Sequence, residues 1–137
     1  MTDAHYFILV LIIGFGAWVY STFIQIEASE SQRNHVRVEW VKDGDSFRIK
    51  APKNTDIRLW GIDAPEKGEE GAEKARNALI QLIKGKRISY KQIDTDRYGR
   101  IVARVFLPDG REVNRLLIEQ GVVSEYCRYS TGFYGQC

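Results

Sequence analysis

An uncharged apolar run near the N-terminus constrains the fold of this chain more than any other feature. The 18 residues from Phe7 to Ile24 include no charged side chain. A helix rising about 1.5 Å per residue would make this run about 27 Å long, close to the thickness of a bilayer core. A small domain has no interior that could surround a helix that is apolar on every side. We therefore expect residues 6–24 to form one transmembrane anchor, after a short tail at residues 1–5.

A cleaved secretory signal is the alternative for the same segment. Such signals usually carry basic residues ahead of a shorter apolar core, whereas residues 1–5 contain neither Lys nor Arg. Ala28 and Ser29 lie where a peptidase could cut. The length of the run favours the anchor, and Trp18 and Tyr20 are aromatic residues suited to a membrane interface.

Two cues for membrane orientation disagree. Arg33 and Arg37 follow the apolar run, and the positive-inside rule would therefore place the C-terminal domain in the cytoplasm. Cys127 and Cys137 delimit a short C-terminal loop, and a disulfide there would indicate an oxidising compartment. Two unpaired thiols are the alternative for these cysteines.

The remaining chain divides into a tether and one domain. Residues 25–35 are polar and lack periodicity, which is typical of a tether. Residues 36–137 form a domain with 19 basic and 15 acidic residues, so its net charge is about +4. This basic excess is compatible with a polyanionic partner but does not require one.

Alternating and β-branched segments predict five strands in the domain. The expected strands span residues 36–41, 46–49, 57–62, 88–93 and 101–107. Ala and Leu residues recur at helical spacing between Ala72 and Ile83, and Gly85 supplies a stop. A second helix is expected over residues 113–120, with Val113, Leu116, Leu117 and Gln120 on one side. Five strands with a helix between the third and fourth predict a mainly β fold with α-helices, a five-stranded OB-fold barrel with two helices.

Three short motifs contain the residues able to do chemistry: KDGDS (residues 42–46), RLWGIDAPE (58–66) and DRYGR (96–100). Each motif alone is compatible with an ordinary turn or loop. Together they supply what phosphodiester hydrolysis requires, namely positive charge for the phosphoryl oxygens and a group that activates water.

Residue type suggests a role for each member of the set. Asp45 and Asp63 are hard oxygen donors suited to calcium, and Glu66 could orient or deprotonate the attacking water. Arg58 and Arg100 offer planar forks that match two phosphate oxygens. The alternative is that these charges merely pair with one another at the surface. Arg58 and Asp63 are five residues apart, which would place them on opposite faces of a strand unless the chain bends at Gly61.

These three motifs, in this order, resemble the staphylococcal nuclease (thermonuclease) family over residues 36–126. The resemblance implies an OB-fold barrel and a calcium ion held by Asp45, Asp63, the backbone oxygen of Ala64 and, through water, Glu66. It also implies that Arg58 and Arg100 bind the scissile phosphate and that Glu66 is the general base. DNA and RNA would be cut without sequence preference to 3'-phosphorylated products.

The resemblance suggests further contacts with the substrate. Arg97 and Tyr98 match positions that approach a terminal phosphate of the nucleotide, and Tyr126 matches an aromatic residue beside the base.

The chain also departs from the family pattern. Ala64 and Ser46 replace threonines, and the chain stops at Cys137, where the founding member continues into a third helix. We expect the Cys127 to Cys137 segment to replace that helix as a disulfide-tied cap.

The expected partners are DNA and RNA as substrates and a membrane bound through residues 6–24, with no obligate protein partner. Calcium is scarce in the cytoplasm, and a nonspecific nuclease there would be hazardous. We therefore expect the domain on the periplasmic or extracellular side, or secreted after signal cleavage. The rival hypotheses are a nucleic-acid-binding or scaffold module with weak catalysis and a membrane-tethered assembly protein.

Overall fold

The computed structural model describes residues 34–50 and 53–137. The expected tail (1–5), the expected anchor (6–24) and most of the expected tether (25–35) lie outside these residues. Within the described ranges, no helix is both long and apolar enough to cross a membrane.

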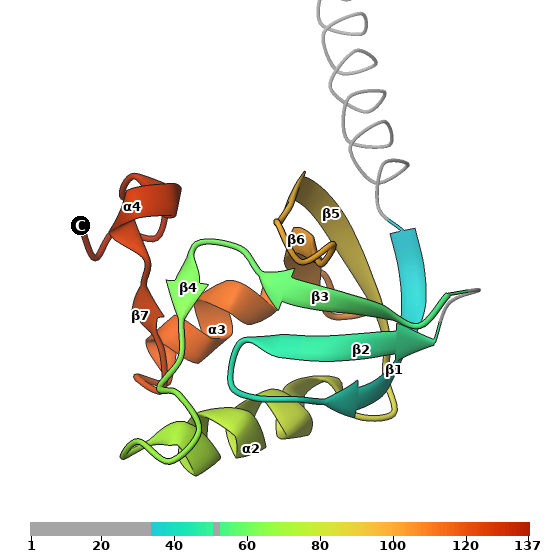
Figure 1. Cartoon of the computed structure of the whole chain (residues 1–137), viewed down its shortest axis with the longest axis horizontal. Helices are drawn as coiled ribbons and strands as arrows, with labels where there is room; N and C mark the ends of the chain where they lie inside the picture. Colours follow the sequence, from blue (N-terminus) through green and yellow to red (C-terminus); the bar gives the residue numbers. More distant parts are fainter. Residues whose placement is uncertain (1–33, 51–52) are drawn as a thin grey trace, which may run out of the picture. The chain divides into compact units, whose positions relative to one another are not determined.

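Five strands close into a barrel, as predicted (Figure 1). They are β1 (Asn34–Val41), β2 (Ser46–Lys50), β3 (Thr55–Leu59), β5 (Arg87–Thr95) and β6 (Ile101–Phe106). Their order around the barrel is β1-β2-β3-β6-β5. The β3–β6 pair is parallel, and the other four pairs are antiparallel. This mainly β architecture confirms the predicted barrel and fits an OB-fold.

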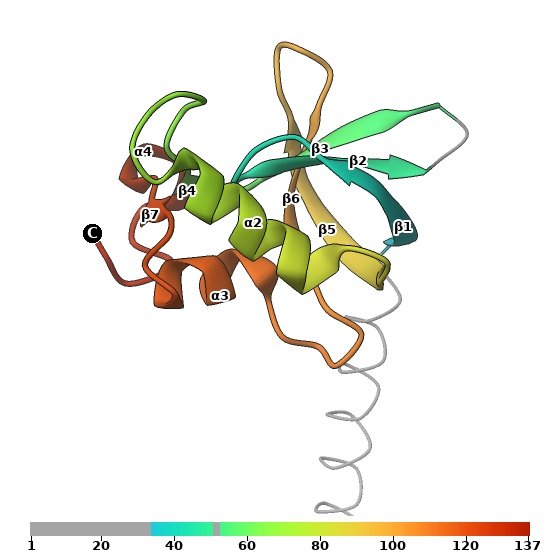
Figure 2. The same ribbon diagram turned by 90° about the horizontal axis from the view of Figure 1, so that it is seen from below.

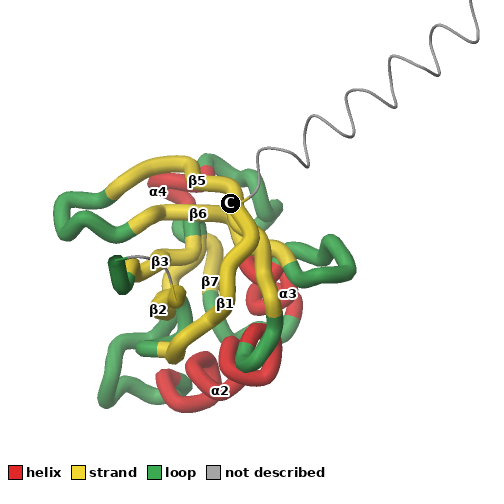
Figure 3. Tube along the Cα trace, turned by 90° about the vertical axis from the view of Figure 1, so that its right-hand side faces the viewer, coloured by secondary structure: helices red, strands yellow, loops and turns green. Residues whose placement is uncertain are grey.

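Two helices lie beside each other against the barrel, as Figures 2 and 3 show. Helix α2 (Ala72–Ile83) buries Ala75, Ala78, Leu79 and Ile83, which follow the helical spacing expected from the sequence. These side chains join the barrel core around Phe47, Ile49, Ile57 and Leu59. The apolar residues that recur at helical spacing in α2 are therefore the ones that pack on the barrel.

Helix α3 (Val113–Glu119) ends one residue earlier than expected. Gln120 was predicted on the apolar side and is exposed, which corrects that prediction. Asn114, at the start of α3, is the polar residue that is buried among the apolar ones. Its side-chain amide donates to the carbonyl of Trp60 (2.9 Å), and its Oδ1 accepts the N–H of Val105 (3.1 Å). A buried amide with both ends satisfied costs little and ties α3 to the barrel.

The expected third strand, residues 57–62, is interrupted. Strand β3 ends at Leu59, the chain turns through Gly61 at φ +71°, and β4 (Ile62–Asp63) pairs with β7 (Ser124–Glu125) outside the barrel. A left-handed φ favours glycine, because a side chain there is strained. The bend that the sequence required at Gly61 is therefore present.

The C-terminal segment packs against this bend. A disulfide joins Cys127 and Cys137, as predicted, and closes a segment that begins with the single helical turn α4 (Cys127–Ser130). The N–H of Tyr126 donates to the carbonyl of Gly61 (2.8 Å). Phe133 and Tyr134 pack their rings on Trp60, with centroids 5.4 Å and 6.0 Å away.

A buried carboxylate organises the same segment. Glu125 accepts the hydroxyl of Ser130 (2.6 Å) and the N–H groups of Tyr134 (2.9 Å) and Gln136 (2.6 Å). Burial opposes the ionised form, but these hydrogen bonds outweigh it and lower the pKa of Glu125. The tail is therefore held by both a covalent bond and an anion.

Candidate functional site

The loop between β1 and β2 is held by hydrogen bonds within the loop and by close packing against α2. The carboxylate of Asp43 accepts the hydroxyl of Ser46 (2.6 Å) and the N–H of Asp45 (3.2 Å). Although burial opposes them, these hydrogen bonds lower the pKa of Asp43. A Cβ at Gly44 would lie 2.6 Å from the Cβ of Ala75, so only glycine lets the loop approach α2 this closely.

Asp45 follows this turn and is nearly enclosed, with 8% of its surface exposed. Its Oδ2 accepts the N–H of Ala64 (2.9 Å) and forms an ion pair with Nη1 of Arg58. Burial raises the pKa of Asp45 to about 6, although Arg58 and the N–H of Ala64 favour the carboxylate. Asp45 is therefore still mainly ionised at neutral pH.

Arg58 connects two of the predicted acidic residues. Its Nη2 donates to Oδ1 of Asp63 (3.1 Å) and to the carbonyl of Ile62 (3.1 Å), while its Nη1 meets Asp45. The bend at Gly61 thus brings Arg58 and Asp63 together despite their odd spacing in the sequence. The pairing of arginines with carboxylates, which the sequence left as an alternative, occurs here inside the site.

Arg100 reaches the site through the parallel pairing of β3 with β6. Arg58 lies opposite Val102, and Arg100 precedes Val102 by two residues, so the strand repeat of two gives the arginines one face. Asp96 accepts the Nε of Arg100 (2.7 Å) and the backbone N–H groups of Arg100 (3.0 Å) and Tyr98 (2.9 Å). Asp96 thus orients Arg100, a role that the sequence did not reveal although the residue opens the DRYGR motif.

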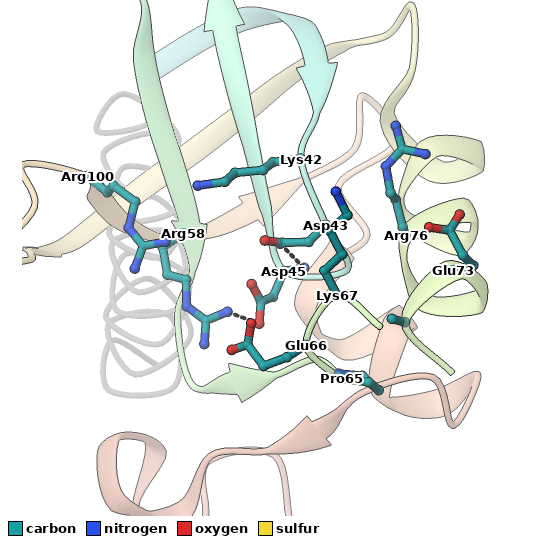
Figure 4. Close-up of a pocket in the computed structure, with 11 residues that line it drawn as sticks. Lys42, Asp43, Asp45, Arg58, Pro65, Glu66, Lys67, Glu73, Arg76 and Arg100 are labelled. Carbon is teal, nitrogen blue, oxygen red and sulfur yellow. Dashed lines mark hydrogen bonds and ion pairs between the residues drawn. The ribbon is translucent and has the colours of Figure 1, made fainter. Parts of the chain in front are cut away.

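An open pocket of about 590 Å³ brings together four of the five predicted residues (Figure 4). Asp45, Arg58, Glu66 and Arg100 line it. Asp63 lies at its side and lines a neighbouring pocket of about 450 Å³ together with Ala64 and Glu66.

Several lining residues were missed by sequence reasoning. They are Lys42, Asp43, Pro65, Lys67, Ala72, Glu73 and Arg76. Lys42 and Asp43 belong to the KDGDS motif, and Lys67 directly follows the second motif. Arg76 carries no local signal, because it depends on how α2 packs beside the loop.

The residues expected to touch the nucleotide do not line the pocket, although the guanidinium of Arg100, which does, lies 5.5 Å from the ring centroid of Tyr98. Tyr98 is 69% exposed, and its hydroxyl accepts an N–H from Arg97 (2.6 Å). The ring of Tyr126 packs edge-on against Tyr129, with centroids 4.8 Å apart. None of the three predicted side chains, Arg97, Tyr98 and Tyr126, is among those that line the pocket.

The donor set fits a hard cation such as calcium. Asp45 and Asp63 meet the same guanidinium, so both carboxylates are within reach of one positive charge. In residues 34–50 and 53–137, no three His, Cys, Asp or Glu side chains form a ready-made metal cluster. Calcium takes carboxylates, backbone carbonyls and water as ligands, so Asp45 and Asp63 supply donors of the right type.

The fold and the site together define an OB-type barrel with an arginine- and carboxylate-lined pocket on its outer surface. Residues 56–136 match the family described as staphylococcal nuclease homologue, and the chain belongs to that family. The resemblance identified from the three motifs is thereby confirmed.

Several curated relatives carry nuclease names. An uncharacterized endonuclease of Escherichia coli is 37% identical over 98 residues, covering 71% of this chain and 64% of the relative. An uncharacterized endonuclease of Haemophilus influenzae is 31% identical over 110 residues, with shares of 79% and 61%. A micrococcal nuclease of Shigella flexneri is 29% identical over 98 residues, with shares of 65% and 56%. The chain thus spans less than two thirds of the length of these relatives.

Proposed function

We propose that this chain is a calcium-dependent endonuclease that hydrolyses phosphodiester bonds in DNA and RNA without sequence preference and leaves 3'-phosphorylated products. One observation carries the proposal: Asp45, Arg58, Glu66 and Arg100 line a single open pocket. Family membership and the printed names of the relatives support the same reaction class.

The two arginines bind the scissile phosphate in this proposal. Arginine stays protonated near neutral pH and can donate two parallel hydrogen bonds to phosphate oxygens. Asp96 occupies the Nε of Arg100, which leaves the N–H groups of both terminal nitrogens for the substrate. Asp45 and Asp63 instead hold the terminal nitrogens Nη1 and Nη2 of Arg58, so this guanidinium is also oriented before substrate arrives, and a phosphate would have to share or displace these pairs.

Glu66 is the group proposed to accept a proton from the attacking water. Its side chain is exposed and lies on the same side of the pocket as Asp45 and Arg58 (Figure 4). Its backbone N–H donates to Oε2 of Glu69 (2.8 Å), which fixes the start of the loop before α2. A carboxylate held at the edge of an open pocket can reach both solvent and a bound phosphate.

Asp45, Asp63, the backbone oxygen of Ala64 and, through water, Glu66 would hold calcium. When bound, calcium supplies positive charge that offsets the charge building on the phosphoryl oxygens.

The proposal is tested by incubating the 137-residue chain with single-stranded DNA, with calcium and with a chelator. We expect calcium-dependent cleavage, and we expect Glu66→Gln to reduce it by about 10²-fold or more. Glu119→Gln, an exposed residue of α3, is the matched control and should cut like the wild type. Equal cutting by wild type and Glu66→Gln would show that Glu66 is not the base.

A binding module with weak catalysis is the second candidate, because five basic side chains line the pocket. Wild type that retains single-stranded DNA in a filter-binding assay, yet leaves it intact with calcium, would favour this candidate. A nuclease and a binding module could both use the contacts expected from Arg97, Tyr98 and Tyr126, since stacking on aromatic rings tolerates any base.

We also propose that residues 6–24 tether the domain at residues 36–137 to a membrane, on its periplasmic or extracellular face. The length of the uncharged run and the C-terminal disulfide support this location. Protease treatment of intact cells tests it: an exposed domain is digested without lysis, whereas a cytoplasmic one is protected. Release of the processed domain into the medium would favour signal cleavage.

A further inference from the structure

We propose that Lys42, Lys67 and Arg76 form a second phosphate subsite in the same pocket, which binds a phosphate next to the scissile one. The inference rests on the proposed function for the identity of the scissile phosphate. It adds a contact to a flanking phosphate, which exists in polynucleotides and not in molecules with a single phosphodiester.

The three side chains come from separate parts of the chain and line the pocket together. Lys42 follows β1, Lys67 lies in the loop before α2, and Arg76 lies in the second turn of α2. The amino group of Lys42 points toward Arg58 and Arg100 across the pocket (Figure 4). A basic lining thus extends from the two arginines to the helix side.

Lys42 and Arg100 also act on a common neighbour. An ion-paired hydrogen bond from Arg48 is the main cause that lowers the pKa of Asp56, and the charges of Lys42 and Arg100 lower it further. The positive charges of Lys42 and Arg100 therefore both act at Asp56 in β3.

None of these three basic groups is held by an ion pair in the described residues, although the charge of Lys42 acts on Asp56. In the part of the chain that the structure describes, no ion pair or side-chain hydrogen bond involves Lys42, Lys67 or Arg76. Some arginines elsewhere are neutralised by carboxylates, as in the pairs Arg48 with Asp56 (2.7 Å) and Arg104 with Glu112 (2.7 Å). Unpaired cations facing one hollow attract an anion, and a phosphate is the anion that the neighbouring arginines are proposed to bind.

Of the four acidic residues in the lining, Asp43 and Asp45 are committed to other groups, and Glu73 lies one helical turn before Arg76 on α2. Asp45 pairs with Arg58, and Asp43 accepts hydrogen bonds from Ser46 and from the N–H of Asp45. Glu66 is assigned to water in the proposed reaction. At about 590 Å³ the pocket also falls in the range that encloses a small organic ligand, so it has room for more than one phosphate.

The test compares two triple variants of the 137-residue chain that lose equal charge. One combines Lys42→Gln, Lys67→Gln and Arg76→Gln. The control combines Lys74→Gln, Lys84→Gln and Lys91→Gln, three exposed residues that do not line the pocket. Lys74 is a matched control for Arg76, because it lies on the same helix two residues away. At about 100° per residue, its side chain leaves the helix on nearly the opposite face.

Steady-state kinetics are measured on an oligothymidylate of twelve residues and on the dinucleoside monophosphate TpT, which has one phosphodiester. The pocket variant should raise the KM for the oligonucleotide about tenfold, and the oligonucleotide-to-TpT ratio of kcat/KM should fall by a similar factor. Losing one phosphate contact should also reduce the slope of log KM against log salt by about 0.7. An unchanged ratio, or the same change in the control variant, overturns the inference.

A binding arm separates this inference from the proposed function. Fluorescence anisotropy of a labelled oligothymidylate is measured with both triple variants in a Glu66→Gln background, where cleavage does not interfere. Weaker binding by the pocket variant alone supports the subsite even if the wild type cuts nothing, an outcome that would reject the nuclease proposal. Equal binding by both triple variants rejects the subsite even if the wild type cuts DNA.

Discussion

Asp45 illustrates how opposing interactions act on a single residue of the site. Burial disfavours its carboxylate, whereas Arg58 and the N–H of Ala64 stabilise it. Burial has the larger effect, so the pKa is raised to about 6. The ionised form of Asp45, which a cation would require, therefore opposes folding, and such perturbed groups are common at functional sites.

Asp45→Asn is expected to remove a pH dependence of stability in protein kept free of metal. Because the folded-state pKa of about 6 lies above the ordinary value of 3.8, the folded chain binds more protons than the unfolded chain between these values. The contribution of Asp45 to the free energy of unfolding should therefore fall as pH rises from about 4 to about 6, by at most about 3 kcal/mol at about 1.4 kcal/mol per pKa unit.

Urea denaturation in chelator at pH 4 and pH 7 measures this effect. From pH 4 to pH 7, the free energy of unfolding of the wild type should change less favourably than that of Asp45→Asn. Identical changes in the two proteins would contradict the raised pKa.

Gly61→Ala is expected to destabilise the chain more than Gly85→Ala. Both glycines have φ +71°, so both substitutions carry the strain of a left-handed residue. Only at Gly61 would the new Cβ also lie 3.1 Å from Ser130 and from the ring of Tyr134, whereas nothing lies within 4 Å at Gly85. Overpacking should add about 1–3 kcal/mol at Gly61, which thermal melting of both variants will measure. Similar melting temperatures would show that the C-terminal segment can shift at no cost.

The sequence was informative about residues whose chemistry is local. Asp45, Arg58, Glu66 and Arg100 were selected by residue type and motif, and they line one pocket. Arg76 could not be found this way, because its position depends on α2 packing beside the loop at Gly44.

At the level of elements, the C-terminal segment from Cys127 to Cys137 connects the disulfide to the site. It packs on Trp60 and Gly61, and β7 pairs with β4, the strand that contains Asp63. The elements that hold this acidic residue in place therefore lie about 60 residues further along the chain.

Reducing the disulfide, or combining Cys127→Ser with Cys137→Ser, is expected to lower the thermal transition. A loop of this size contributes about 2–3 kcal/mol by restricting the unfolded chain. In a domain of about 100 residues, 1 kcal/mol corresponds to about 4–8 °C. The measurement is calorimetry with and without reductant, with the double variant as the control that should no longer respond. A wild-type transition that reductant leaves unchanged would end the idea of a tied cap.

Element prediction succeeded where a period is long enough to be recognised. The five barrel strands and the helices α2 and α3 each span five or more residues, and their apolar positions follow the expected spacing. Strands β4 and β7 have two residues each, too few for any period, and they exist because distant segments pair. The same tertiary context explains why the third strand stops at Leu59.

For the whole molecule, a chain that begins at Asn34 is expected to fold by itself. All described strands and helices lie from Asn34 onward, and β1 closes the barrel by pairing with β5. Such a chain should melt cooperatively and remain in the supernatant after ultracentrifugation with membranes, whereas the 137-residue chain should sediment with them. Sedimentation of both chains would argue against the anchor at residues 6–24.

The parallel pairing of β3 with β6 also bears on biosynthesis. Ile57 lies opposite Ile101, so this contact cannot form until the second half of the domain has left the ribosome. Until then Arg58 and Arg100 are not brought together, and a nascent or partly folded chain lacks the arginine pair proposed to bind phosphate. With the proposed nuclease activity, the order in which the barrel closes would delay cleavage of the cell's own nucleic acids until the domain is complete.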